Sequence, residues 1–301
     1  MKSKNYCDMH IHTNYSDGEL SVSELLKLAN KKNLKKLSIT DHDCVDAYFE
    51  IKNTHLDFDG EILIGCEFSC VVDNLPIEIL GYGFDFKKIK SFLDIYGLPQ
   101  SKLDEIHCSN FIKICKKFDV DIDFNYEKSY QVCKNFMKHK LLYQDLIKND
   151  VIYNNLKQID ARFIETSSNL IRFGINNPDC ELYQNSAKQF SDAKKIIDII
   201  HNNGGLCFVA HPYQYGENMF AILEKLKDSI DGIEVYHFTS DTKQKQQPLI
   251  DFCKQNNLLM CGGSDYHYIV DVEHKKDKLN ELKVPKELFE KILDKVKYKN
   301  L

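Results

Sequence analysis

Short apolar, β-branched segments alternate along the chain with longer segments whose apolar residues recur every three to four positions. The first kind predicts strands and the second predicts amphipathic helices. The predicted strands are Asn5–Ile11, Lys36–Thr40, Glu61–Glu67, Ile77–Gly83, Leu206–Ala210, Gly232–Tyr236 and Leu258–Cys261. The predicted helices are Leu20–Lys32, Asp192–Asn203, Glu217–Lys227 and Thr242–Gln255, with a last helix that begins at Pro285. This alternation predicts an α/β fold with a parallel sheet, closed into a barrel.

The strand pattern fades between about residues 99 and 190. That stretch is rich in Lys, Asn and Tyr, and helical patterns cover Asp104–Phe118 and Lys138–Asn149. We therefore expect a barrel formed by residues 1–98 and 191–301, with residues 99–190 inserted as a mainly helical subdomain that covers one end of it. The alternative is that some of the barrel helices are merely long.

Composition and charge narrow the class of protein. The chain has 301 residues, of which 43% are apolar, and this is enough for a continuous core. The formal charge of -5 argues against duplex nucleic acid or an anionic membrane as a partner. No signal peptide and no apolar run of about 18 residues is visible, so a cytoplasmic location is expected. Eleven cysteines without a C-x-x-C pair are typical of reduced thiols. The sequence does not indicate the oligomeric state.

Histidines and carboxylates recur where the predicted strands end. Asp8, His10 and His12 alternate on the first strand and share one face of it. Other strands end in T-D-H-D at 40–43, Glu67, A-H-P at 210–212 and G-S-D-Y-H at 263–267. The carboxyl ends of parallel strands meet at one end of a barrel. Burying unpaired imidazoles and carboxylates together is costly, so this convergence predicts a metal site.

This series of motifs resembles that of the PHP family, the polymerase and histidinol phosphatase metal-dependent phosphoesterases. The resemblance also includes Thr13, Ser16, Asp17 and Gly18, together with the G-x-E at 65–67. The subgroup that the chain resembles is the nucleoside 3′,5′-bisphosphate phosphatases and short-RNA exonucleases, which carry an inserted helical region. The resemblance implies a distorted (β/α)7 barrel that holds up to three metal ions.

Carried over residue by residue, the resemblance implies three adjoining metal sites. The first would use His10, His12, Glu67 and Asp265. Glu67 would bridge to a second site, completed by His211 and Glu78, and the third would use Asp17, His42 and His267. The resemblance thus implies two to three divalent ions, and imidazole mixed with carboxylate favours Mn, Zn or Fe. Glu78 departs from the family pattern, which has His there, and it either ligates a metal or faces solvent or a lysine.

The charges of such a site imply a mechanism. A bound divalent ion brings the pKa of its water toward about 7 and clamps phosphoryl oxygens, so the expected reaction is hydrolysis by a metal-bound hydroxide. The substrate would be a phosphomonoester similar to a nucleoside bisphosphate, or a short oligonucleotide. Asp265 would orient or deprotonate the water, and His211 or His267 would assist protonation of the leaving group. Asp8 would accept a ligand N–H and fix its tautomer.

Substrate recognition is expected in the inserted region, where the related phosphatases carry an Arg-Pro-His that contacts phosphate. Here His139 matches that motif, and Lys134, Lys138 or Lys140 would replace the missing arginine. The only two arginines, Arg162 and Arg172, lie in the same region. For any single lysine or arginine among these, a solvated helix face is the favoured alternative. His237 matches no motif, although it directly follows a predicted strand.

Three other functions remain open. Within the family, a histidinol-phosphate phosphatase is the alternative. A C–N hydrolase of the amidohydrolase type also uses an H-x-H motif, but it usually needs a carboxylated lysine, for which the chain offers no convincing candidate. The last alternative is a metal-binding module without activity.

Overall fold

The computed structural model describes residues 6–54, 56–121, 138–185, 187–267 and 279–298. The chain forms two compact units. Unit 1 comprises residues 1–72, 77–97 and 191–301, and unit 2 comprises residues 73–76 and 98–190.

Unit 1 is built on a six-stranded mixed sheet with the order β6-β4-β5-β7-β8-β9. Its strands are β4 (Gly65–Val72), β5 (Leu75–Tyr82), β6 (Ser191–Asp192), β7 (Leu206–Val209), β8 (Gly232–Tyr236) and β9 (Leu259–Gly262). Two further pairs join β1 (Tyr6–Cys7) to β10 (Val284–Pro285) and β2 (Lys36–Leu37) to β3 (Glu61–Ile62). Isolated parallel bridges link Asp8 to Leu37, Ile11 to Tyr266 and His42 to Glu67.

The sheet is mixed, whereas a parallel one was expected. β7, β8 and β9 are parallel to one another, but β5 is antiparallel to β7. The cause is the two-residue turn at Asp73 and Asn74, whose φ angles of 50° and 66° both lie in the left-handed region that tight hairpin turns require. This turn reverses the chain between β4 and β5. Glu67 therefore lies within the long strand β4 and does not end a strand as predicted.

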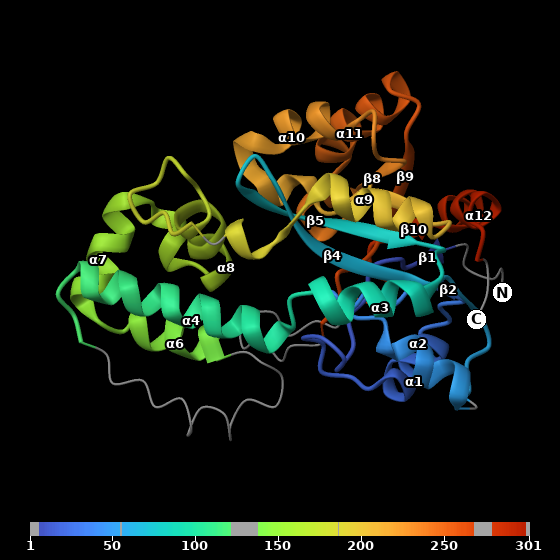
Figure 1. The fold of residues 1–301 in the computed structure, drawn as a ribbon, viewed down its shortest axis with the longest axis horizontal. Helices are drawn as coiled ribbons and strands as arrows, with labels where there is room; N and C mark the ends of the chain where they lie inside the picture. Colours follow the sequence, from blue (N-terminus) through green and yellow to red (C-terminus); the bar gives the residue numbers. More distant parts are fainter. Residues whose placement is uncertain (1–5, 55, 122–137, 186, 268–278, 299–301) are drawn as a thin grey trace. The chain divides into compact units, whose positions relative to one another are not determined.

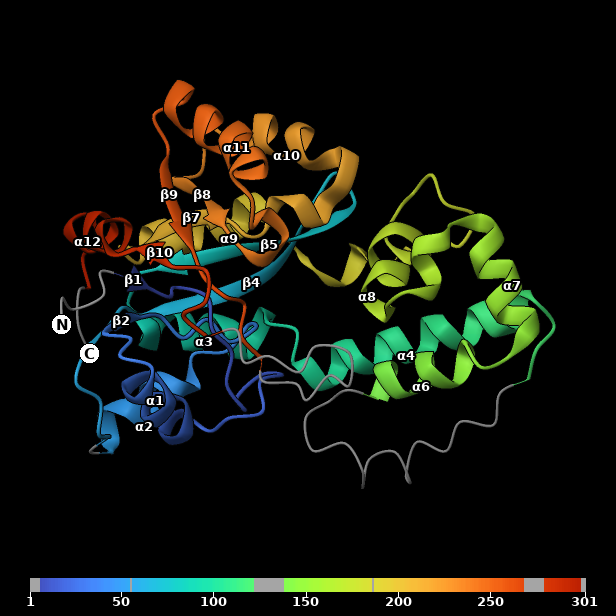
Figure 2. The same cartoon turned by 180° about the vertical axis from the view of Figure 1, so that it is seen from behind.

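The helices of unit 1 lie on the two sides of this sheet (Figures 1 and 2). On one side are α9 (Ala193–Asn202), α10 (Met219–Leu226) and α11 (Lys243–Gln255), and on the other are α1 (Val22–Lys31), α2 (Asp46–Asn53) and α3 (Phe86–Tyr96). α12 (Lys286–Lys295) contacts β1 and β9. Ser21 caps α1 through a capping box with Glu24, which satisfies backbone N–H groups at the start of the helix.

The core of unit 1 ties the amino-terminal segment to the sheet. Met9, Tyr82 and Phe208 are fully buried together with Phe289 of α12. The hydroxyl of Tyr82 donates a hydrogen bond to the carbonyl oxygen of Met9 over 2.8 Å. A buried tyrosine satisfied in this way holds the backbone beside His10 in place.

In its described residues, unit 2 is mainly helical. It contains α4 (Gln100–Lys117), α6 (Lys138–Leu146), α7 (Asp150–Ile159) and α8 (Ser167–Asn169), with the short helices η1 (Ala161–Ile164), η2 (Leu170–Ile175) and η3 (Ala187–Gln189). α4 and α6 lie side by side (Figure 1) and enclose a core that includes Phe111, Leu142 and Phe163. Within the described ranges, every helix falls short of what a bilayer-spanning segment requires.

Candidate metal centre

The carboxylate of Glu67 lies at the centre of a cluster of imidazoles in unit 1. Its side chain is fully buried in β4. Oε2 lies 3.1 Å from His10 Nε2, 3.3 Å from His12 Nε2 and 3.2 Å from His42 Nδ1. Oε1 lies 2.9 Å from His211 Nε2. One carboxylate is therefore shared by four histidines that come from three other segments of the chain.

His10, His12, Glu67 and Asp265 form one group whose donor atoms all lie within 4.8 Å of one another. These are the four residues implied for the first metal site. The segment that carries Asp265 approaches His10 so closely that a Cβ at Gly263 would overlap the backbone N of His10. Only glycine allows this approach, and it brings the G-S-D segment beside the H-x-H motif.

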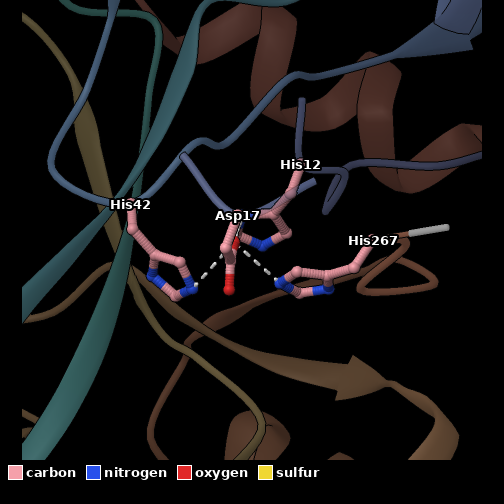
Figure 3. A group of neighbouring side chains, drawn as sticks. All are labelled: His12, Asp17, His42 and His267. Carbon is pink, nitrogen blue, oxygen red and sulfur yellow. Dashed lines mark ion pairs between the residues drawn. The ribbon is translucent and has the colours of Figure 1, made fainter. Parts of the chain in front are cut away.

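A second group combines the residues implied for the third site, Asp17, His42 and His267, with His12. Figure 3 shows the three imidazoles arranged around the carboxylate of Asp17. Asp17 Oδ1 lies 3.1 Å from His267 Nε2, 3.7 Å from His42 Nε2 and 3.7 Å from His12 Nδ1. His12 thus faces this group with one ring nitrogen and the first group with the other, which the sequence did not suggest.

Glu78 lies inside the cluster and does not turn toward a lysine. Its Oε2 is 3.2 Å from His211 Nε2, and its Oε1 is 3.8 Å from His42 Nδ1. The hydroxyl of Tyr215 accepts a hydrogen bond from the backbone N–H of Glu78 over 2.9 Å, which fixes the strand at this point. The side chain of Glu78 remains 24% exposed, so this edge of the cluster is reached by solvent.

Two loops bring Asp17 and His42, residues implied for the third site, into place. Asp41 is buried and accepts hydrogen bonds from the backbone N–H of Thr13 over 2.7 Å and from the hydroxyl of Ser16 over 2.6 Å. These bonds fold the loop that carries Asp17, and the Gly18 N–H donates to the carbonyl oxygen of Thr13. The T-x-x-S-D-G part of the first motif therefore has a structural explanation.

Glu234 was missed by the sequence reasoning. It contacts the ring nitrogen of His10 in the way that was expected of Asp8. Glu234 is fully buried; its Oε1 lies 2.9 Å from His10 Nδ1, and its Oε2 accepts the backbone N–H of His211 over 2.8 Å. Asp8 accepts backbone N–H groups instead, among them that of Ser264 over 2.9 Å. A glutamate in the middle of the apolar strand G-I-E-V-Y was the signal that could have revealed it.

The imidazoles and carboxylates of the cluster shift one another's pKa values toward the charged forms. Burial disfavours the imidazolium of His12, but the adjoining carboxylates of Asp265 and Glu67 raise the pKa of His12 to about 10. In the same way, the pKa of His211 is raised to about 9 by Glu67 and Glu78 against the effect of burial. Burial favours protonated Glu67, yet the imidazoles of His10 and His42 hold the pKa of Glu67 well below its usual value. The carboxylates of Glu67, Asp17 and Asp265 thus stay charged, and without a cation His10, His12 and His211 hold compensating protons.

The donor set fits divalent metal ions. Several buried donor atoms in the cluster make no hydrogen bond in the described part of the chain, among them His12 Nε2, His42 Nδ1 and Asp17 Oδ1. Buried polar atoms that converge without hydrogen-bond partners are costly unless a cation binds among them. Imidazole nitrogens mixed with carboxylate oxygens suit Mn, Fe or Zn better than Ca or Mg.

The residues predicted to bind substrate lie in unit 2. Lys138 and His139 begin α6, and buried Asp104 accepts the backbone N–H of both and lies 2.5 Å from His139 Nδ1. The guanidinium of Arg162 is paired with Asp160, and Arg172 is half-buried in η2. Lys134 lies outside the described residues. The role of these side chains in substrate binding stays a prediction.

Comparison with known proteins defines the class to which the fold and site belong, that of metal-dependent phosphoesterases. The chain belongs to the PHP domain family, whose model matches residues 8–295. It is 23% identical over 266 residues to a 5′-3′ exoribonuclease of Haemophilus influenzae, covering 87% of this chain and 89% of that protein. It is 20% identical over 263 residues to a phosphoribosyl 1,2-cyclic phosphate 1,2-diphosphodiesterase of Eggerthella lenta, covering 86% and 93%. The family predicted from the motifs is confirmed.

Two solved structures share the fold. One is an amidohydrolase from Chromobacterium violaceum with bound sulfate and no metal, with a TM-score of 0.65, 20% identity and 98% of each chain covered. The other is a candidate metal-dependent phosphoesterase from Bifidobacterium adolescentis, with a TM-score of 0.61, 19% identity and 96% of each chain covered. At this level of identity, these likenesses concern the fold alone.

Proposed function

We propose that the protein is a metal-dependent hydrolase of phosphoester bonds in nucleotide-like substrates, either a nucleoside bisphosphate or a short oligonucleotide. The observation that carries the proposal is the sharing of the Glu67 carboxylate by four imidazoles, because this arrangement gathers adjoining metal sites around one buried anion. The relatives are named for exonucleolytic attack on RNA and for hydrolysis of a phosphoribosyl cyclic phosphate, and both activities break phosphoester bonds.

The metal complement that we propose is two to three divalent ions of Mn, Zn or Fe. The first is held by His10, His12, Glu67 and Asp265, the second by Glu67, His211 and Glu78, and the third by Asp17, His42 and His267. Contacts of 3.2 Å from His211 to Glu78 and 3.1 Å from His267 to Asp17 support the second and third sets. Such ions supply a nucleophile at neutral pH and neutralise charge on the phosphoryl oxygens.

The roles of the side chains follow from their exposure. Asp265 is 13% exposed, whereas His10, His12 and Glu67 of the same group are closed to solvent. Asp265 is therefore the residue placed to orient the attacking water and accept its proton. His211, which is 3% exposed, or His267, which is 18% exposed, would assist protonation of the leaving oxygen.

The strands of unit 1 are proposed to close into the distorted (β/α)7 barrel. The bridges from Asp8 to Leu37, from His42 to Glu67 and from Ile11 to Tyr266 support closure, because they connect the segments of β1, β2, β4 and β9 around the cluster. Residues 99–190 are proposed as the subdomain that covers substrate, through Lys138, His139, Arg162 and Arg172. A cytoplasmic location is proposed on the free thiols of the described cysteines.

Phosphate release after metal removal and reloading tests the proposed function. Protein stripped with a chelator should be inactive on a nucleoside 3′,5′-bisphosphate and on a short 5′-phosphorylated RNA, and Mn should restore activity on at least one of them. Asp265→Asn should remain inactive after reloading, while His201→Gln, which changes an exposed histidine outside the cluster, should behave as wild type. Histidinol phosphate and an N-acyl substrate belong in the same panel. Turnover of either of these alone would replace the proposal with the corresponding alternative.

A further inference from the structure

His237 lies at the carboxyl end of β8, directly before the short helix η5 (Phe238–Ser240). It is fully buried, and its ring centroid is 5.3 Å from that of His211 and 6.1 Å from that of His10. Nevertheless, none of the metal-binding groups found among the described residues includes it. A buried imidazole beside the cluster, outside the sets of converging donors, needs another explanation.

The hydrogen bonds of His237 define its tautomer. Thr239 donates its backbone N–H to His237 Nδ1 over 3.2 Å, and the Thr239 hydroxyl lies 2.7 Å from the same nitrogen. A backbone N–H can only donate, so Nδ1 carries a lone pair and the proton of the neutral ring is on Nε2. Nε2 lies 3.3 Å from Asp265 Oδ2. His237 therefore presents an N–H to one oxygen of Asp265.

The other oxygen of Asp265 faces the proposed metal ligands. Oδ1 lies 3.3 Å from His10 Nε2 and 3.2 Å from His12 Nε2. The backbone of Asp265 has a φ of 52°, a left-handed conformation that aspartate tolerates. The torsion that turns a carboxylate about its Cβ–Cγ bond is soft, so the backbone alone leaves the direction of the two oxygens open. A donor on Oδ2 settles which oxygen points into the cluster.

We propose that His237 is a positioning residue that binds Asp265 Oδ2 through its Nε2–H and so aims Oδ1 at the first metal group. The inference rests on the proposed function, in which Asp265 is a metal ligand. It assigns to His237 the orienting role that partners of metal ligands commonly have, for which loss of the partner costs about 10–100-fold in metal affinity.

A matched pair of amide substitutions tests this inference. In His237→Gln, the amide nitrogen reaches the position of Nε2 and keeps a donor on Asp265, whereas in His237→Asn the shorter side chain falls short of it. Metal-stripped proteins are titrated with Mn by calorimetry, and the bound ions are counted by elemental analysis. His237→Asn should lower the affinity for one Mn ion about 10–100-fold, and the affinity of His237→Gln should stay within about threefold of wild type. Equal affinity in His237→Asn and wild type, or equal losses in the two variants, would overturn the inference.

Two further measurements keep the outcome specific. The unfolding temperature of each metal-stripped variant shows whether a loss of metal merely follows from a damaged fold, and the inference requires a loss of affinity in His237→Asn that exceeds any loss of stability shared with His237→Gln. Asp265→Asn is titrated in parallel. If Asp265→Asn binds Mn as wild type does, the proposed function has the wrong ligand; if only His237→Asn behaves as wild type, the inference alone fails.

Discussion

His211 Nε2 lies 2.9 Å from Glu67 Oε1 and 3.2 Å from Glu78 Oε2, so that one imidazole joins two carboxylates. The nearby charge of Glu67 disfavours ionised Glu78, as burial does, and the imidazoles of His211 and His42 outweigh both and lower the pKa of Glu78. Two carboxylates held this close favour a cation between them.

Changing Glu78 should alter the metal content selectively. We expect Glu78→Gln to lose the second ion and to retain the first and third, because neither of these sets includes Glu78. Glu78→His should retain three ions and shift preference from Mn toward Zn, since imidazole is the softer ligand. Elemental analysis after loading with equal Mn and Zn measures both effects. Unchanged metal content and turnover in both variants would exclude Glu78 as a ligand.

Removal of the Glu67 charge should affect the whole cluster. In Glu67→Gln, the carboxylate shared by His10, His12, His42 and His211 becomes a neutral amide. We expect turnover to fall at least about 100-fold and at least one ion to be lost. Loss of a residue that only hydrogen-bonds to a metal ligand commonly costs about 10–100-fold in metal affinity or activity, and Glu67 contacts the cluster more directly. Phosphate release and metal counting provide the test. A variant with normal occupancy and turnover contradicts a bridging role.

The metal-stripped protein should lose stability as pH rises above about 6.5. The folded protein keeps protons on His12 up to a pKa of about 10 and on His211 up to about 9, whereas an unfolded histidine releases its proton near 6.5. Between these values the folded state binds more protons, so the free energy of unfolding falls with rising pH. Urea unfolding in the presence of chelator measures this effect.

Metal affinity should change in the opposite direction across the same pH window. Ions displace the protons on these histidines, so affinity for Mn should rise between about pH 6.5 and 10. A stripped protein whose stability rises over that range, or a Mn affinity that falls, would show that the histidines are not protonated in the way the contacts imply.

Substitution of Gly263 should test its close approach to the His10 backbone without changing any proposed metal ligand. A methyl group there would overlap the backbone of His10, so Gly263→Ala should cost about 1–3 kcal/mol or more and disturb the first metal group. Gly174→Ala is the matched control, because its Cβ would meet only side-chain atoms, the nearest at 3.2 Å. Thermal unfolding compares the two. Equal melting temperatures would argue against the close approach at Gly263.

Much of the site is predictable because its residues lie in short, ordered motifs. His10 and His12 are recognisable because they alternate on one strand, and T-D-H-D and G-S-D-Y-H are recognisable because they follow apolar segments. Glu234 and His237 escape such reasoning, because their partners, His10 and Asp265, come from distant parts of the chain. Sequence shows that a buried polar group must be paired, but not with which residue.

The fold likewise has features that the sequence predicts and features that it does not. The helix that begins after Ser21 and the parallel strands β7, β8 and β9 follow from periodicity and capping. The reversal at Asp73 and Asn74 was missed, although two consecutive residues of this type are favoured in hairpin turns. The apolar stretch after them matches a buried parallel strand equally well, and only the antiparallel pairing of β5 with β7 shows that it is reversed.

We propose above all that His10, His12, Glu67 and Asp265 hold a metal ion together. Anomalous diffraction from crystals grown with Mn tests it most directly. We predict a manganese peak bounded by these four side chains, with further peaks beside His211 and Asp17. Strong anomalous signal elsewhere, with the four side chains turned apart and no peak between them, would contradict the account.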